Sequence, residues 1–184
     1  MGRPRDPSID ERALDATRRL LDEEGLTATT VQAVAKRSGV HASAIYRRWP
    51  TRIDLIYDAA FADLPPGRIR PTGDLRRDLG RFVRAYVATF ELPVVRAAIP
   101  AIVAARGSGD PSPRVLTHLS VRPQFRDIIA AAPPGEADRT VDPDQVFDLL
   151  LGAVLVRTLV PDEVRRLPKI DDTVDLLMRV LTPR

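Results

Sequence analysis

The chain has 184 residues, of which 44% are hydrophobic and 29% charged, so it is long enough to bury a sizeable core. It contains no cysteine, which excludes disulfides, thiolate catalysis and zinc fingers, and which is compatible with a reducing cytoplasm. Its N-terminus carries no apolar signal segment and no apolar run is long enough to span a bilayer, so we expect a cytoplasmic protein without a membrane partner.

The net charge of +3 comes from the N-terminal part of the chain. Residues 1–52 hold ten Lys and Arg against seven acids, whereas residues 53–184 hold eighteen of each. From Gly25 to Ile53 there is no acid, and this stretch carries five cations: Lys36, Arg37, Arg47, Arg48 and Arg52. Such a segregated charge favours attraction to nucleic-acid phosphates, although a solvated basic face would give the same count.

Two helices are predicted before residue 40. The first runs from Ser8, which forms a capping box with Glu11, to Gly25, and its apolar residues recur at helical spacing. Thr30 can cap a second helix of about two turns. Gly39 then stands where a sharp turn between helices needs a left-handed residue.

The third and fourth helices complete the N-terminal pattern. The third is predicted at residues 42–49, with Ile45 and Trp49 pointing inward and the other face open. Thr51, with Asp54 three residues later, starts the fourth helix. The second and third helices, joined by a tight turn and basic on the outside, indicate a helix-turn-helix.

The rest of the chain is also predicted to be helical, which gives an all-α fold of about nine helices. Asp74 and Asp142 serve as caps, and Pro100 and Pro123 predict kinks or local breaks. The five further helices are expected at about residues 74–91, 93–106, 113–131, 142–160 and 171–181.

The N-terminal stretch is similar to a known family. Thr30–Val40 (TVQAVAKRSGV) and Ala44–Leu55 (AIYRRWPTRIDL) resemble the DNA-binding domain of the tetracycline-repressor (TetR) family, and the similarity covers about residues 8–57. The remainder is similar only in helix count and in residues 147–154 (FDLLLGAV). The resemblance implies a homodimeric, all-helical transcriptional regulator, and its C-terminal domain is expected to bind a small effector.

The implied domain division places the helix-turn-helix domain at residues 1–52, with a flexible basic N-terminal arm. Residues 53–184 then form a helical domain for effector binding and dimerisation. By the same resemblance, Thr30, Tyr46 and Arg52 contact phosphates. Ala42, Ser43 and Arg48 fall at positions that often reach base edges. The full predicted DNA-binding set is Thr30, Lys36, His41, Ala42, Ser43, Tyr46, Arg47, Arg48 and Arg52.

Several of these assignments have an alternative. Tyr46 could be a half-buried core aromatic, and Arg48 could be a solvated charge instead of a bidentate partner of guanine. Arg3 and Arg5 could enter a minor groove or belong to a disordered terminus. His41 is interpreted as a surface or phosphate contact and not as a pH sensor.

The last two helices are predicted to form a dimer interface. Residues 142–160 are apolar on almost every side, so one side is expected to face the chain's own core and another a partner. Two helices from each subunit would make a four-helix interface, although both could simply be core helices. The predicted interface residues are Phe147, Leu151, Val154, Leu155, Leu177 and Leu181.

Aromatic residues suggest where an effector could bind. Phe82, Tyr86 and Phe90 recur at every fourth position of one helix, and His118 and Phe125 lie on another. A cavity between them would be aromatic with few polar groups and would suit a small, mostly apolar effector. The same stripe could be plain core.

The expected function is that of a repressor released from a palindromic operator by such an effector. An architectural DNA-binding protein without an effector is the alternative, and saturable, operator-specific binding that a small molecule releases would exclude it. An enzyme is disfavoured because the two histidines are far apart and no paired-carboxylate or metal-ligand spacing is present. No cofactor and no metal are expected.

Overall fold

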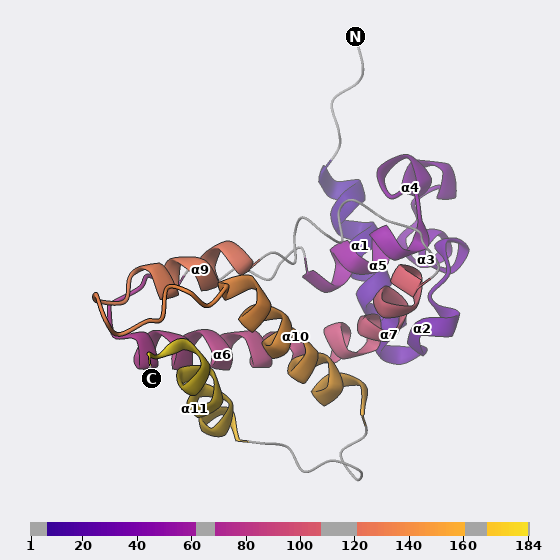
Figure 1. The fold of residues 1–184 in the computed structure, drawn as a ribbon. Coiled ribbons are helices and arrows are strands. Elements are labelled where there is room, and N and C mark those ends of the chain that lie inside the picture. Colours follow the sequence, from indigo (N-terminus) through magenta and orange to yellow (C-terminus); the bar gives the residue numbers. More distant parts are fainter. Residues whose placement is uncertain (1–6, 62–68, 108–120, 161–168, 184) are drawn as a thin grey trace. The chain divides into compact units, whose positions relative to one another are not determined.

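The computed structural model describes residues 7–61, 69–107, 121–160 and 169–183, and these contain ten helices and no strand (Figure 1). The predicted all-α fold is therefore confirmed, and the described residues alone contain ten helices, where about nine were expected for the whole chain. The predicted arm with Arg3 and Arg5, and His118, lie outside the described residues.

The described helices form two compact units. The first unit contains α1 (Pro7–Glu23), α2 (Gly25–Ala28), α3 (Val31–Ser38), α4 (Ala42–Arg48), α5 (Arg52–Phe61) and α7 (Pro93–Gly107). The second contains α6 (Leu75–Glu91), α9 (Arg122–Ala130), α10 (Pro143–Leu159) and α11 (Ile170–Leu181). The predicted functional division after residue 52 falls at the start of α5, so it does not coincide with this structural division and stays a prediction.

The core of the first unit lies between α1, α3, α4 and α5. Ile45 and Trp49 are both buried in it, as predicted from their spacing. Helix α1 packs against α3 and α5, and α7 packs against α1, α2 and α5. The buried core residues are Ala13, Ala16, Leu20, Val31, Val34, Val40, Ile45, Trp49 and Leu55. Each large member contributes roughly 1.5 to 3 kcal/mol by leaving water, which fixes the two helices of the helix-turn-helix on α1.

Three predicted helix boundaries around the helix-turn-helix are confirmed. The hydroxyl of Thr30 accepts a hydrogen bond from the amide of Ala33 at 3.1 Å and caps α3. Gly39 is left-handed, with φ of 69°, at the turn between α3 and α4. Before α5, the Asp54 amide donates to the Thr51 hydroxyl and the Thr51 amide donates to the Asp54 carboxylate, both at 3.1 Å.

The first helix differs from its prediction at both ends. It begins at Pro7, so Ser8 lies inside the helix and not at its cap. Proline is well suited to the first helical position because its missing amide hydrogen would have no partner there. At the other end Gly25, with φ of 78°, begins the short helix α2 after α1 has ended at Glu23. Four residues are too few to show helical periodicity, which is why α2 was missed.

In the second unit, α6 packs against α9, α10 and α11. Asp142 caps α10 by accepting from the amide of Asp144 at 2.9 Å, as predicted. Pro123 lies in the first turn of α9, so it starts a helix where a kink was expected. The preceding part of that predicted helix, residues 113–120, lies outside the described residues. In the first unit, α7 continues through Pro100.

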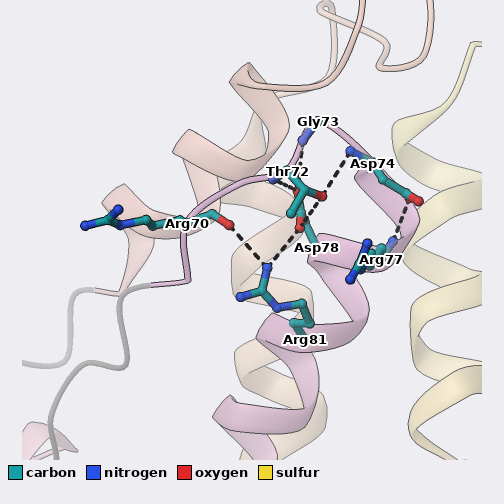
Figure 2. Close-up of polar contacts among 7 residues, drawn as sticks. All are labelled: Arg70, Thr72, Gly73, Asp74, Arg77, Asp78 and Arg81. Carbon is teal, nitrogen blue, oxygen red and sulfur yellow. Dashed lines mark hydrogen bonds and ion pairs between the residues drawn. The ribbon is translucent and has the colours of Figure 1, made fainter.

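A buried carboxylate fixes the turn before α6 (Figure 2). Asp78 is 1% exposed and accepts hydrogen bonds from the Thr72 amide at 2.6 Å, the Thr72 hydroxyl at 3.0 Å and the Gly73 amide at 3.3 Å. Arg81 donates to the same carboxylate at 3.4 Å and to the Arg70 carbonyl at 3.2 Å. The charge of Asp78 is thus compensated, as burial requires, and the start of α6 is held in place. Asp74 caps the helix, accepting from the Arg77 amide at 2.9 Å, as predicted.

Within the described residues, no single helix has the length and apolarity to cross a membrane, and the consecutive helices Leu75–Glu91 and Pro93–Ala105 meet that test only when taken as a pair.

Candidate nucleic-acid interface

The outer face of α4 presents polar side chains to solvent. His41, Ser43, Tyr46 and Arg47 are exposed, and Tyr46 has 46% of its surface accessible. Ile45, on the opposite side of this seven-residue helix, is fully buried. Figure 1 shows α4 at the periphery of the unit. Tyr46 is therefore outside the buried core of the unit, with about half of its surface accessible.

Thr30 and Lys36 are exposed at the two ends of α3. The Thr30 hydroxyl accepts from the Ala33 amide, and a hydroxyl that accepts can still donate its own hydrogen to an anion. Ala42, at the start of α4, is only partly exposed. The first turns of α3 and α4 therefore offer backbone amides and small polar groups of the kind that bind phosphate.

Arg37, in the acid-free stretch, binds two acids at the junction of α1 and α2. Its guanidinium contacts the carboxylates of Glu23 at 2.6 Å and Glu24 at 2.7 Å. These two acids precede the stretch in sequence, yet the fold brings them against it. The positive charge of Arg37 is thus largely compensated within the protein.

Arg48 was expected at a base edge, but its side chain is directed inward. The Nε atom donates to the carboxylate of Asp10 on α1, and Nη1 donates to the Ala44 carbonyl at 3.2 Å. Only 9% of the Arg48 side chain is exposed. This arrangement argues against the predicted contact of Arg48 with a base and also against a merely solvated charge.

Arg52 was expected to face phosphate, and it too is bound to the protein. Its Nε atom donates to the Thr29 carbonyl at 2.6 Å, and Nη2 donates to the Leu26 carbonyl. These carbonyls belong to α2 and to the residue that follows it. A guanidinium can satisfy both at once because its donors form a rigid fork. The first residue of α5 is thereby tied to the junction of α2 and α3.

Lys36 and Arg47 are the remaining cations of the stretch, and both are exposed. Among the described residues neither of them has an acidic partner within ion-pair distance. Of the five cations counted in the sequence, Lys36 and Arg47 are thus the two whose side chains are not bound to a protein acceptor among the described residues.

The predicted aromatic residues of the second unit come together. Phe82, Tyr86, Phe90 and Phe125 are all at most 7% exposed. The Phe82 and Phe125 rings are 5.3 Å apart between centroids, and Tyr86 lies 5.6 Å from Phe147. These are ordinary contact distances for packed rings. We call Phe82, Tyr86, Phe90, Phe125 and Phe147 the aromatic cluster; it has the packing of a core.

A separate hollow of about 270 Å³ lies between α6 and α11. Charged residues dominate its lining, which consists of Asp74, Arg76, Arg77, Gly80, Arg84, Asp171 and Val174. It is not the apolar pocket expected from the aromatic residues. In the described part of the chain, no group of three His, Asp or Glu could hold a metal ion.

Most of the predicted interface residues face the protein's own core. Phe147, Val154, Leu177 and Leu181 are at most 5% exposed, and Phe147 belongs to the aromatic cluster. Leu151 and Leu155 are partly exposed. The large exposed apolar side chains of α10 and α11, which we call the apolar face, are Leu149 (67%), Val156 (60%), Leu159 (42%), Leu176 (61%) and Val180 (36%). The sequence could not show which side of α10 faces outward because that helix is apolar all round.

Two family models match the chain. One describes bacterial regulatory proteins of the tetR family and covers residues 13–59, and the other describes a tetracyclin repressor-like C-terminal domain and covers residues 69–177. HTH-type transcriptional regulators of Mycobacterium tuberculosis and Mycobacterium bovis are 30% identical over 185 residues, covering 96% of this chain and 89% of theirs.

Solved structures agree in fold. The TetR family regulator SCO0332 is 28% identical, with a TM-score of 0.70, and the alignment covers 96% of this chain and all of that one. A TetR regulator from Agrobacterium tumefaciens has a TM-score of 0.66 at 18% identity, covering 96% of this chain and 94% of that chain. The matched models span both units, and the relatives are transcriptional regulators and not enzymes. The chain belongs to the TetR family of bacterial transcriptional regulators, with a helix-turn-helix DNA-binding domain at its N-terminus.

Proposed function

We propose that this regulator is a cytoplasmic repressor that binds a near-palindromic operator as a homodimer and is released by a small, mostly apolar effector. The observation that carries the DNA-binding part is the exposed polar face of α4, opposite a fully buried Ile45. A short helix anchored on one side and polar on the other is the form in which a recognition helix enters the major groove.

The proposed contacts divide by chemistry. Tyr46 and Thr30 donate their hydroxyls to phosphates, and Lys36 supplies a positive charge near the backbone. Ser43, with its neighbour Ala42, faces base edges at the start of α4, and Arg47 lies beside them. His41, the N-cap residue of α4, is exposed and suits a phosphate contact. Arg48 and Arg52 support this surface from within, since their guanidinium groups bind protein atoms.

The apolar face supports the proposed homodimer. Leu149, Val156 and Leu176 each have about 60% or more of their surface exposed, which is costly for a set of large apolar residues on two helices of one unit. Burial of the apolar face against a second copy of the chain would remove that cost. Helices α10 and α11 of each subunit would then form a four-helix interface. A two-fold dimer presents two recognition helices to successive major grooves, about 34 Å apart, and hence favours a palindromic operator.

The aromatic cluster is the proposed effector site. Its rings would accept an apolar ligand, because few polar groups lie among them. The rings are in contact in the described conformation, so a ligand would have to separate them. The same close packing supports the competing proposal, in which the protein binds DNA without any effector.

A mobility-shift experiment on the DNA flanking the gene tests the proposal. We expect saturable binding to one palindromic fragment, and release of that fragment by a hydrophobic compound that also raises the melting temperature. Binding of equal strength to scrambled DNA would refute the operator. Stabilising compounds that never release the DNA would favour the effector-independent alternative.

A further inference from the structure

The last turn of α4 is fastened to the first turn of α1. Arg48 and Asp10, which are 38 residues apart, form an ion pair through Nε and a carboxylate oxygen. The Arg48 side chain is 9% exposed and that of Asp10 is 37% exposed. Among the ion pairs of the described residues, no other arginine is so deeply buried. The Asp10–Arg48 ion pair is therefore a partly buried contact within the unit and not an exposed surface ion pair.

The guanidinium of Arg48 is oriented by two different groups. Besides Asp10, it donates through Nη1 to the carbonyl of Ala44, one turn back on its own helix. Because the guanidinium is planar, two such bonds define its direction. The Arg48 guanidinium is largely buried, so it is costly to leave it without a partner. Removal of Asp10 therefore destabilises the inward orientation of Arg48, and removal of Arg48 leaves Asp10 without its partner.

This contact bears on the rotation of α4 about its axis. The helix has seven residues, and the one it buries fully is Ile45. Successive residues of a helix are about 100° apart, so Arg48 shares the inner side with Ile45 while Ser43, Tyr46 and Arg47 lie outward. Ile45 and the adjoining Trp49 anchor this short helix through apolar contacts. The ion pair of Arg48 adds a directed contact to α1, which further restrains rotation of the helix.

We propose that Asp10 and Arg48 are positioning residues, which set the rotation of α4 and through it the register of the outward residues on DNA. Arg48 then affects sequence preference without touching a base, and Asp10, on another helix, has an equal effect. This inference rests on the proposed operator-specific binding. The positioning hypothesis can be distinguished from base readout. Base readout requires Arg48 alone, whereas positioning requires both Arg48 and Asp10.

The test compares Asp10→Asn, Arg48→Gln and the double variant. The measurement is the ratio of affinities for two duplexes at one salt concentration, one selected from random sequences by the wild-type protein and the other a scrambled duplex of the same composition. Taking the ratio cancels the general electrostatic effect of removing a charge. We expect each single change to lower the ratio about tenfold and the double variant to lower it no further, because coupled residues are not additive.

Two variants serve as controls. Asp10→Glu keeps the carboxylate and is expected to retain most of the ratio. Asp15→Asn removes the exposed Asp15–Arg19 pair of the same helix, whose side chains are 55% and 65% exposed, and should leave the ratio unchanged. If Arg48→Gln lowers the ratio while Asp10→Asn does not, Arg48 reads a base directly and the proposal is wrong. If both variants melt at lower temperature with unchanged ratios, the pair serves stability alone and the proposal is equally wrong.

Amide hydrogen exchange in the free protein provides a test that needs no DNA. Loss of the Asp10 carboxylate should accelerate exchange in α4 more than in α3, since the contact joins α4 to α1 and does not involve α3. Equal exchange rates in the wild type and Asp10→Asn would overturn the inference. Failure of the proposed operator-specific binding would give a different result from failure of this inference. The wild-type protein itself would then bind the selected and the scrambled duplex with equal affinity.

Discussion

The salt dependence of operator binding should be much weaker than the sequence suggests. Each phosphate neutralised by a Lys or Arg contributes about −0.9 to the slope of log affinity against log salt concentration. Five available cations per subunit would give ten in a dimer and a slope of about −9. In the structure Arg37, Arg48 and Arg52 bind protein groups. The two remaining cations per subunit give a slope of about −3.6.

The difference is large enough for an ordinary titration. Between 50 and 200 mM salt, a slope of about −3.6 weakens binding about 150-fold, whereas one of about −9 weakens it by more than about 10⁵-fold. Fluorescence anisotropy with the operator duplex at four or so salt concentrations measures the slope. Arg3 and Arg5, outside the described residues, could add up to about −3.6 more. The measurement is therefore made on a variant with alanine at both positions.

Single substitutions sharpen this prediction. Lys36→Ala should make the slope less steep by about 1.8 in the dimer, one phosphate per subunit. Arg37→Ala should leave the slope unchanged, because its charge is already paired with Glu23 and Glu24. A slope near −9 in the variant without the arm arginines would refute the reasoning, since the internal pairs would then have to open on DNA.

Three further outcomes are expected. Leu149→Asp should give a folded monomer in sedimentation and circular dichroism, whereas Val154→Asp should unfold the second unit, because Val154 is 2% exposed. Phe125→Ala should destabilise that unit by about 3 to 5 kcal/mol in thermal denaturation, since Phe125 is fully buried against Phe82 and Phe147; an unchanged melting temperature would contradict this. The hydrogen bond from Arg126 lowers the pKa of Asp144. The pair therefore stabilises the fold above the ordinary carboxyl pKa, and its contribution is lost as pH falls through the lowered value. Asp144→Asn should lower the melting temperature at neutral pH but not in strong acid, and an equal loss at both would exclude the pair as its cause.

The helix boundaries at Thr30, Gly39 and Thr51 were predictable because their causes are local. Thr30 bonds to an amide three residues ahead, and Thr51 and Asp54 satisfy each other. Gly39 adopts a left-handed backbone conformation that is unfavourable for residues with a side chain. Each signal lies within four residues of the structure that it determines. The same holds for Asp142 at the start of α10.

The direction of the arginine side chains was not predictable, because their partners are distant in sequence. Asp10 is 38 residues from Arg48, and Leu26 is 26 residues from Arg52. A count of charges within the acid-free stretch treats all five cations as equivalent. The fold separates them into three that bind protein groups, namely Arg37, Arg48 and Arg52, and two that are exposed without such a contact among the described residues, namely Lys36 and Arg47. Likewise, the uniform apolarity of α10 did not show which of its apolar side chains are exposed.

The contacts of α5 constrain how an effector could act on DNA binding. Arg52 ties α5 to the end of α2, and the Trp49 indole donates to Asp58 at 2.8 Å, which ties the end of α4 to α5. Arg18 on α1 donates to the Ala59 carbonyl at 2.8 Å. A displacement of α5 would therefore move α1, α2 and α4 with it and leave the recognition surface intact. Release of an operator by such a displacement would act through the separation of two intact recognition surfaces in a dimer. A tenfold loss of affinity then requires the effector to favour the non-binding arrangement by only about 1.4 kcal/mol.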